Sequence, residues 1–176
     1  MVKAIDVKNI PASALTQLAT GLSTQNDTVN LLRRAHAQYP ADFWINHNLG
    51  NALGRATPPE QEEAVRFLTA AIALRPESPG CFFNLGIAQK GKGQLEEAIT
   101  CYKKVIEFQP NYVAAHNGLG NSLRKIGQLD EAIACSHKAI ELDPKDATYH
   151  NNLGVALKDM GQLGEAVACI RIWPVL

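Results

Sequence analysis

The cysteine and histidine residues are the first candidates for chemistry, because thiolates and imidazoles bind metals and act as nucleophiles or bases. Cys101, Cys135 and Cys169 follow one another at intervals of 34 residues, and His116 and His150 are separated by the same interval. Equivalent helices of a repeating structure lie about 8–10 Å or more apart, beyond the roughly 7 Å Cα limit for a disulfide. No Cys-x-x-Cys pair occurs. We therefore expect structural thiols, no metal site and no cofactor.

Motifs that would indicate catalysis are absent from the sequence. It contains neither a Gly-x-x-x-x-Gly-Lys-Ser/Thr phosphate loop nor a Gly-x-Ser-x-Gly nucleophile elbow. The acidic pairs Glu62-Glu63, Glu96-Glu97 and Asp130-Glu131 fit the first turns of helices, where negative charge complements the helix dipole. We therefore expect that the protein is not an enzyme.

The composition limits the kinds of partner. The 176 residues are 46% hydrophobic, and 17 basic residues balance 17 acidic ones. Binding to nucleic acid or to anionic lipid needs an excess of basic residues, so we expect neither partner. No apolar stretch approaches the roughly 20 residues that span a bilayer, and Met1 to Lys8 does not resemble a signal peptide. We expect a cytoplasmic protein with protein or peptide partners.

The sequence repeats with a period of 34 residues. Prolines recur at Pro40, Pro76, Pro110 and Pro144, which are 36, 34 and 34 residues apart. Leu-Gly pairs recur at Leu49-Gly50, Leu85-Gly86, Leu119-Gly120 and Leu153-Gly154, and the string Gly-Gln-Leu-x-Glu-Ala begins at Gly93, Gly127 and Gly161. Self-similarity at a fixed period is typical of repeat architectures.

One repeat predicts one helical hairpin. Apolar residues fall at helical spacing from Val113 to Ile126, Gly127-Gln128 interrupts the pattern, and it resumes until Asp143-Pro144 stops it. A glycine within a helix costs roughly 0.5–1 kcal/mol, so Gly120 needs a packing reason. We expect that Gly120 and Ala132 let the two helices approach closely.

These motifs resemble the tetratricopeptide repeat (TPR) family from about Phe43 to the C-terminus. The resemblance implies an all-α fold, a right-handed superhelical solenoid of antiparallel helix pairs. The residues that carry the repeat signature are Gly50, Ala64, Pro76, Gly86, Ala98, Pro110, Gly120, Ala132, Pro144, Gly154 and Ala166.

The period divides the chain into six segments. They are an N-terminal tail (1–8), a degenerate TPR-like helix pair (9–42), TPR 1 with a two-residue insertion (43–78), TPR 2 (79–112), TPR 3 (113–146) and a truncated TPR 4 (147–176). Asp27 or Asn26 is expected to cap the second helix of the degenerate pair. Thr57 and Glu60 have the spacing of a capping box, and Pro58 can open a helix there.

The pattern breaks at the C-terminus, where Trp173-Pro174 should stop the last helix near Ile172. No polar capping element follows to cover the last apolar face. The apolar residues of this segment are Ile170, Ile172, Trp173, Val175 and Leu176. We expect a C-terminal edge that can support self-association.

The TPR resemblance implies that positions two, five, nine and twelve of each repeat line a concave groove, and these spacings lie on one helix face. Position five gives His47, Phe83, Asn117 and Asn151, and position nine gives Asn51, Ile87, Asn121 and Val155. Position twelve gives Gly54, Lys90, Arg124 and Lys158. Amides beside cations can bind the backbone and the acidic groups of an extended peptide. The alternative is a solvated polar face without a ligand.

Two TPR binding modes match only in part. Asn51 and Asn84 fit the carboxylate clamp of chaperone-binding TPR domains, but His47, Ala114 and Gly118 stand where that clamp has cations. Asn48, Asn84 and Asn152 resemble the asparagine row in the TPR arm of O-linked N-acetylglucosamine transferases, which Gly118 interrupts.

The sequence predicts a non-catalytic protein-interaction scaffold, with two alternatives. The run from Leu31 to Asn51 resembles TPR regions at the C-terminal end of bacterial serine/threonine protein kinases, which implies an arm severed from a larger enzyme. The third reading is a repeat fragment that associates with itself through its C-terminal edge.

Overall fold

The structure is a computed structural model that describes residues 7–172, with side chains described as far as Cys169. Within this part the chain forms ten helices and no strand. The prediction of an all-α fold built from helix pairs is confirmed. In the same part of the chain, no helix has the length and hydrophobicity needed to cross a membrane.

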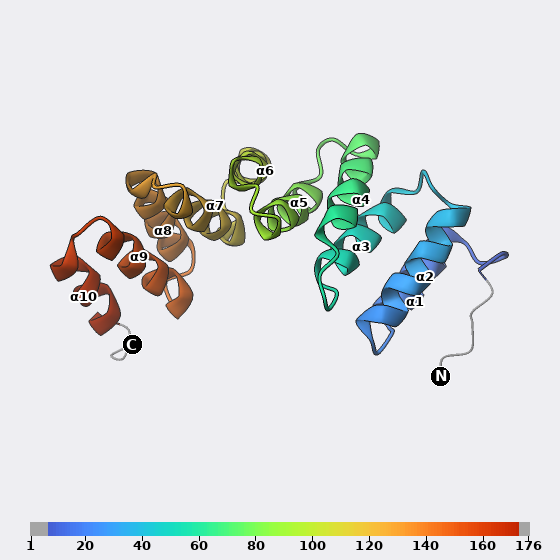
Figure 1. Ribbon diagram of the computed structural model, residues 1–176, viewed down its shortest axis with the longest axis horizontal. Coiled ribbons are helices and arrows are strands. Elements are labelled where there is room, and N and C mark those ends of the chain that lie inside the picture. Colours follow the sequence, from blue (N-terminus) through green and yellow to red (C-terminus); the bar gives the residue numbers. More distant parts are fainter. Residues whose placement is uncertain (1–6, 173–176) are drawn as a thin grey trace. The chain divides into compact units, whose positions relative to one another are not determined.

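The helices divide between two compact units, Met1–Lys92 and Gly93–Leu176. The first unit contains α1 (Ala12–Thr20), α2 (Gln25–Gln38), α3 (Phe43–Gly54), α4 (Gln61–Leu74) and α5 (Pro79–Gly91). The second unit contains α6 (Leu95–Phe108), α7 (Val113–Lys125), α8 (Leu129–Leu142), α9 (Ala147–Asp159) and α10 (Leu163–Ile172). Figure 1 labels all of them.

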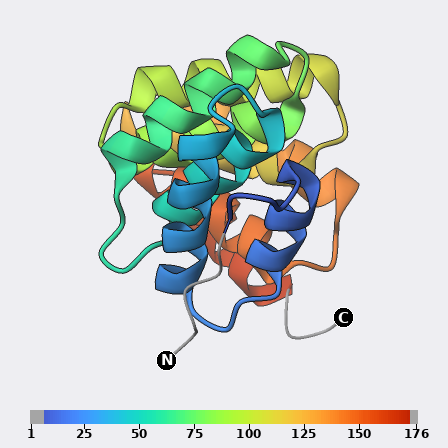
Figure 2. The same cartoon turned by 90° about the vertical axis from the view of Figure 1, so that its right-hand side faces the viewer.

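The first unit is built by stacking helices in chain order. Helices α1 and α2 pack side by side, as Figures 1 and 2 both show, and α3 packs on both of them and on α4. Gly50 lies at the crossing of α3 and α4, where an added Cβ would come within 2.6 Å of the Cγ of Leu68. The residue must therefore be glycine for the two helices to approach this closely.

The second unit repeats the same contact. Helix α7 packs against α8, and a Cβ on Gly120 would lie 3.1 Å from the Cβ of Cys135 and 3.3 Å from the carbonyl of Ala132. The predicted close approach at Gly120 and Ala132 is confirmed. An apolar cluster forms where Leu153 and Leu157 of α9 pack with Ala166 of α10.

The Gly-Gln-Leu strings form turns between consecutive helices. Gly93, Gly127 and Gly161 have φ of 80°, 84° and 87°, in the left-handed region that favours glycine. After α7, the backbone N–H of Gln128 donates to the carbonyl of Leu123 at 3.0 Å. This six-residue closure is the bond of a Schellman motif, which satisfies carbonyls left open at a helix end.

Two helices begin at residue types that favour a helix start, and two begin differently from the prediction. Ser78 is the N-cap of α5 with Pro79 first in the helix, and the side chain of Asp146 accepts a bond from the N–H of Thr148 at the start of α9. The prediction for α2 is wrong, because Thr24 caps it by accepting from the N–H of Asp27 at 3.1 Å. The Thr24 hydroxyl, two residues before Asn26 and three before Asp27, satisfies a donor left open at the helix start.

The start of α4 is also corrected. The helix begins at Gln61 rather than at Pro58, and its N-cap Glu60 makes no side-chain capping bond. The Glu60 carboxylate instead receives a 2.6 Å bond from the guanidinium of Arg33 on α2. The Glu60 side chain therefore contacts a neighbouring helix pair and does not form the predicted capping box. The proposed C-terminal edge around Trp173 lies outside the described residues.

Candidate functional site

Helices α3 and α5 are the first helices of two consecutive repeats. Residues of α3 and α5, together with Arg55, line a hollow of about 280 Å³ in the first unit. We call it the Ile87 hollow. Its lining residues are Gly50, Asn51, Gly54, Arg55, Phe83, Asn84, Ile87 and Ala88. Ile87 is 39% exposed in this hollow. Four residues expected in the groove, Asn51, Phe83, Asn84 and Ile87, are thus brought together.

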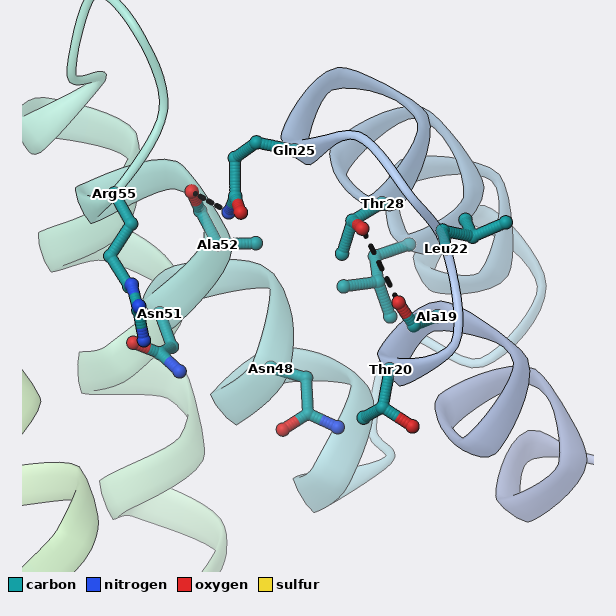
Figure 3. A pocket seen from close by; sticks show the side chains of 10 residues that line it. Ala19, Thr20, Leu22, Gln25, Thr28, Asn48, Asn51, Ala52 and Arg55 are labelled. Atoms are coloured by element: carbon teal, nitrogen blue, oxygen red, sulfur yellow. Dashed lines mark hydrogen bonds between the residues drawn. The ribbon is translucent and has the colours of Figure 1, made fainter.

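A second hollow, of about 300 Å³, lies between α3 and the α1–α2 pair (Figure 3). We call it the Arg55 pocket. Its lining residues are Ala19, Thr20, Leu22, Gln25, Thr28, Leu32, Asn48, Asn51, Ala52 and Arg55. Polar groups dominate this wall, and none of the lining residues is acidic. Neither Arg55 nor the α1–α2 pair was among the residues expected on a binding surface.

Two hydrogen bonds hold the walls of the Arg55 pocket in place. The amide of Gln25 on α2 donates to the carbonyl of Ala52 on α3 at 2.7 Å. The hydroxyl of Thr28 on α2 contacts the carbonyl of Ala19 on α1 at 3.3 Å. Figure 3 marks both bonds with dashed lines. Because these side chains join the helices to one another, they fix the shape of the pocket.

An aromatic cluster lies at the beginning of α3. The guanidinium of Arg75 lies over the ring of Phe43 at 4.2 Å and over that of Trp44 at 5.4 Å. Trp44 is 49% exposed and lines a third hollow with the segment Arg75 to Pro79. Trp44 occupies position two of its repeat, which the TPR resemblance assigns to the groove, so the signal was available in the sequence.

His47 links the aromatic cluster to the amides of α5. Its ring stacks on Phe43 with centroids 5.9 Å apart, and its Nε2 lies 3.1 Å from the amide nitrogen of Asn84. The amide donates to this nitrogen when the imidazole is neutral. Burial lowers the pKa of His47, which favours that neutral form. His47 therefore does not replace the cation of a carboxylate clamp.

The second unit carries polar groove residues that bind one another. The side-chain oxygen of Asn117 on α7 accepts from the amides of Asn121, at 3.2 Å, and of Asn152 on α9, at 2.6 Å. The guanidinium of Arg124 pairs with the carboxylate of Asp159 at 2.6 Å. These groups join α7 to α9, so their hydrogen-bonding capacity is partly used within the protein.

The expected row of cations is therefore not a row of equivalent free charges. Arg124 is ion-paired with Asp159, Lys158 is exposed, and Lys90 is half-buried at the end of α5. In the remaining groove columns Asn151 is exposed and Val155 is half-buried.

Gly118 interrupts the asparagine row for a steric reason. A Cβ at this position of α7 would lie 2.8 Å and 2.9 Å from two ring carbons of Tyr102 on α6. Tyr102 is fully buried, and burial raises the pKa of its hydroxyl. The aromatic ring thus takes the space that a side chain would need at position 118.

The periodic histidines and cysteines have structural surroundings. The Nε2 of His116 lies 2.8 Å from the carbonyl of Pro110, and His150 makes the equivalent contact with Pro144 at 3.0 Å. A carbonyl only accepts, so each imidazole donates and ties its helix to the preceding loop. The four cysteines are free thiols. Burial raises the pKa of Cys101 to about 11, which suppresses the reactive thiolate.

Comparison with known proteins agrees with the repeat pattern. A family model described as TPR repeat matches residues 91–126 and 120–161. No curated protein matches the sequence. Neither the family model nor the solved structures lend support to the kinase resemblance.

Solved structures of MamA share the fold. The structure of MamA 41-end from Desulfovibrio magneticus RS-1 has a TM-score of 0.84 and 20% identity, with 92% of this chain and 90% of that chain covered. MamA MSR-1 C2 gives 0.81 at 21% identity and covers 94% of each chain. A crystal structure of MamA protein gives 0.81 at 20% identity, covering 91% of this chain and 88% of that chain. Residues 91–161 of this chain thus match the TPR repeat family model, and the chain shares its helical fold with the MamA structures.

Proposed function

We propose that this protein is a non-catalytic interaction scaffold that binds an extended segment of a partner protein along the first helices of its repeats. One observation carries the proposal: in the first unit, two open hollows adjoin on either side of α3 and share Asn51 and Arg55. A ligand that lies across α3 would reach both.

The lining groups suit a peptide. The amide of Asn51 offers a donor and an acceptor, which are the groups that a peptide backbone needs as partners. Phe83 and Ile87 provide an apolar wall for a ligand side chain. Several contacts of this kind support affinities in the micromolar range, about −8 kcal/mol.

We propose no reaction in these hollows. Catalysis needs a nucleophile or an acid-base group within hydrogen-bond reach of its partner. The walls of the Ile87 hollow hold amides, glycines, apolar groups and one guanidinium. Arginine stays protonated at all ordinary pH values, so it serves recognition rather than proton transfer.

The test is a pull-down from cell lysate in which bound proteins are identified by mass spectrometry and binding is then measured with the purified partner. The variant Ile87→Ala removes an apolar group that is 39% exposed in the hollow. Its matched control is Leu74→Ala, which removes a 42% exposed apolar group at the end of α4, outside both hollows. We expect Ile87→Ala to weaken binding by about tenfold, or about 1.4 kcal/mol.

Equal affinity of the parent, Ile87→Ala and Leu74→Ala proteins would contradict binding in the Ile87 hollow. Weakening by Leu74→Ala alone would place the partner on the second helices instead. Circular dichroism of each variant establishes that the helices are retained.

A further inference from the structure

We propose that the Arg55 pocket binds an acidic side chain of the partner peptide, and that an apolar side chain about three residues away occupies the Ile87 hollow. The inference rests on the proposed function and names the chemistry of the ligand. It also assigns a binding role to the α1–α2 pair.

The basic side chains of the first unit differ in whether they have a partner. In the first unit, Arg33 pairs with Glu60 and Glu63, Lys92 pairs with Glu62, and the guanidinium of Arg75 stacks on Phe43. Arg55, which follows the end of α3, is exposed and forms no ion pair among residues 7–169. Because no lining residue of its pocket is acidic, a ligand carboxylate there would meet the Arg55 guanidinium without a competing negative charge.

Neighbouring donors make the pocket suitable for a carboxylate. Asn48, Asn51 and Arg55 are three and four residues apart, so they project from one face of α3. Figure 3 shows Asn51 on α3 beside Arg55, which directly follows the helix, with Asn48 one turn earlier. A guanidinium and amide N–H groups donate to carboxylate oxygens in charge-assisted hydrogen bonds, which are about twice as strong as neutral ones.

The relation between the two hollows gives the spacing of the ligand residues. One hollow lies between α3 and the α1–α2 pair, and the other lies between α3 and α5. Packed helices are about 8–10 Å apart, and an extended peptide advances about 3.3 Å per residue. The ligand therefore covers the distance from one hollow to the other in about three residues.

The occupant is an acidic side chain within the peptide rather than a chain end. Both hollows share Asn51 and Arg55, so a ligand in the Arg55 pocket passes directly into the Ile87 hollow. Thr20, the last residue of α1, and Leu22, in the turn after it, line the other side of the pocket, where the peptide would continue.

The experiment uses the full chain and fluorescein-labelled peptides in a neutral Ser/Gly background, blocked at both ends, with binding read by fluorescence anisotropy. One series holds a glutamate and a leucine at separations from adjacent to six positions. A second replaces glutamate by glutamine, and a third replaces glutamate by glycine and leaves the C-terminal carboxylate free. The protein variants are Arg55→Gln, Arg55→Lys and the charge-matched control Lys125→Gln, at an exposed position on α7.

We expect the blocked glutamate peptide with a separation of about three to bind best. Replacing its glutamate by glutamine, or Arg55 by Gln, should each weaken binding about tenfold, and the two changes together should weaken it no further. Arg55→Lys should retain part of the affinity because the charge remains. Lys125→Gln should bind like the parent.

Equal binding of the glutamate and glutamine peptides, or no effect of Arg55→Gln, would overturn the inference. It would also fail if no peptide of the series bound the parent protein, or if the peptide with a free C-terminus bound best. Loss of partner binding in Ile87→Ala, seen together with any of these results, would leave the scaffold function standing. The two proposals therefore fail separately.

Discussion

The two units present the same helix face in two different states. In the second unit, Asn117, Asn121 and Asn152 bind one another and Arg124 binds Asp159. In the first unit, Asn51 and Arg55 line two hollows, and Arg55 has no acidic partner among residues 7–169. A polar surface that satisfies itself gains stability between repeats, whereas one that does not retains its capacity for a ligand. The repeat pattern alone does not distinguish them.

The largest expected effect comes from completing the asparagine row of the second unit. Gly118→Asn places a Cβ within 2.8 Å of the Tyr102 ring. We expect a loss of about 1–3 kcal/mol in the free energy of unfolding, measured by urea denaturation, because the ring is buried and must move. The double variant Gly118→Asn/Tyr102→Ser should lose less than the sum of its single changes, since the smaller residue removes the clash. Additive losses would show that the two positions do not compete for space.

A smaller effect should follow when the ion pair of the second unit is broken. Asp159→Asn leaves Arg124 without its carboxylate partner, as Arg55 is in the first unit. In an Arg55→Gln background, we expect this change to improve binding of the blocked glutamate peptide about two- to fivefold, the range of a partly exposed ion pair. The glutamine peptide serves as the control. Unchanged binding would mean that releasing the Arg124 guanidinium from its ion pair is not enough for the second unit to bind the peptide.

The sequence predicted most of the fold but less of the site. Helix pairs, the turn glycines and the close approach at Gly50 and Gly120 follow from short-range pattern, because each depends on residues within one hairpin. The Arg124–Asp159 pair joins residues 35 apart and exists only when neighbouring repeats stack. Arg55 is at position thirteen of its repeat. The expected groove residues came only from positions two, five, nine and twelve, so Arg55 was not among them. Contacts between repeats decide which polar residues remain available.

Acidic pH should affect the first unit through its histidines. Burial lowers the pKa of His47 and also that of His36. Unfolded imidazoles take up protons near pH 6.5 while these folded ones resist it, so the unfolded state binds more protons as the pH falls. The free energy of unfolding should therefore decrease below about pH 6.5.

The measurement compares urea denaturation at about pH 7.5 and 5.5. His47→Gln should reduce the difference between the two pH values, and part of it should persist because His36 remains. The control His137→Gln changes an exposed residue on α8 and should leave the difference as it is in the parent. An identical pH dependence in the parent and in His47→Gln would contradict the role given to burial.

The smallest effect concerns one amide of the second unit. Asn121→Ala removes a 3.2 Å bond to Asn117, while the shorter bond from Asn152 remains. We expect a loss of about 0.5–1 kcal/mol in the free energy of unfolding by urea denaturation, as for a single half-buried hydrogen bond. Asn51→Ala, at the equivalent position of the first unit, should cost less, because among residues 7–169 the Asn51 amide makes no such side-chain hydrogen bond. Equal costs at the two positions would remove the contrast between the units.

The fit of Gly118 against Tyr102 means that the repeats are not interchangeable parts, although their signatures look alike. The residues 34 positions later are Asn152 and Ser136, a larger residue in place of glycine and a smaller one in place of tyrosine. A chimera that duplicated residues 113–146 in tandem would set a second copy of Gly118 against Ser136 and leave a void at the junction. Lengthening this array would require the residues on both sides of a junction to be exchanged together. The sizes of the side chains at each junction therefore determine which repeat can follow which.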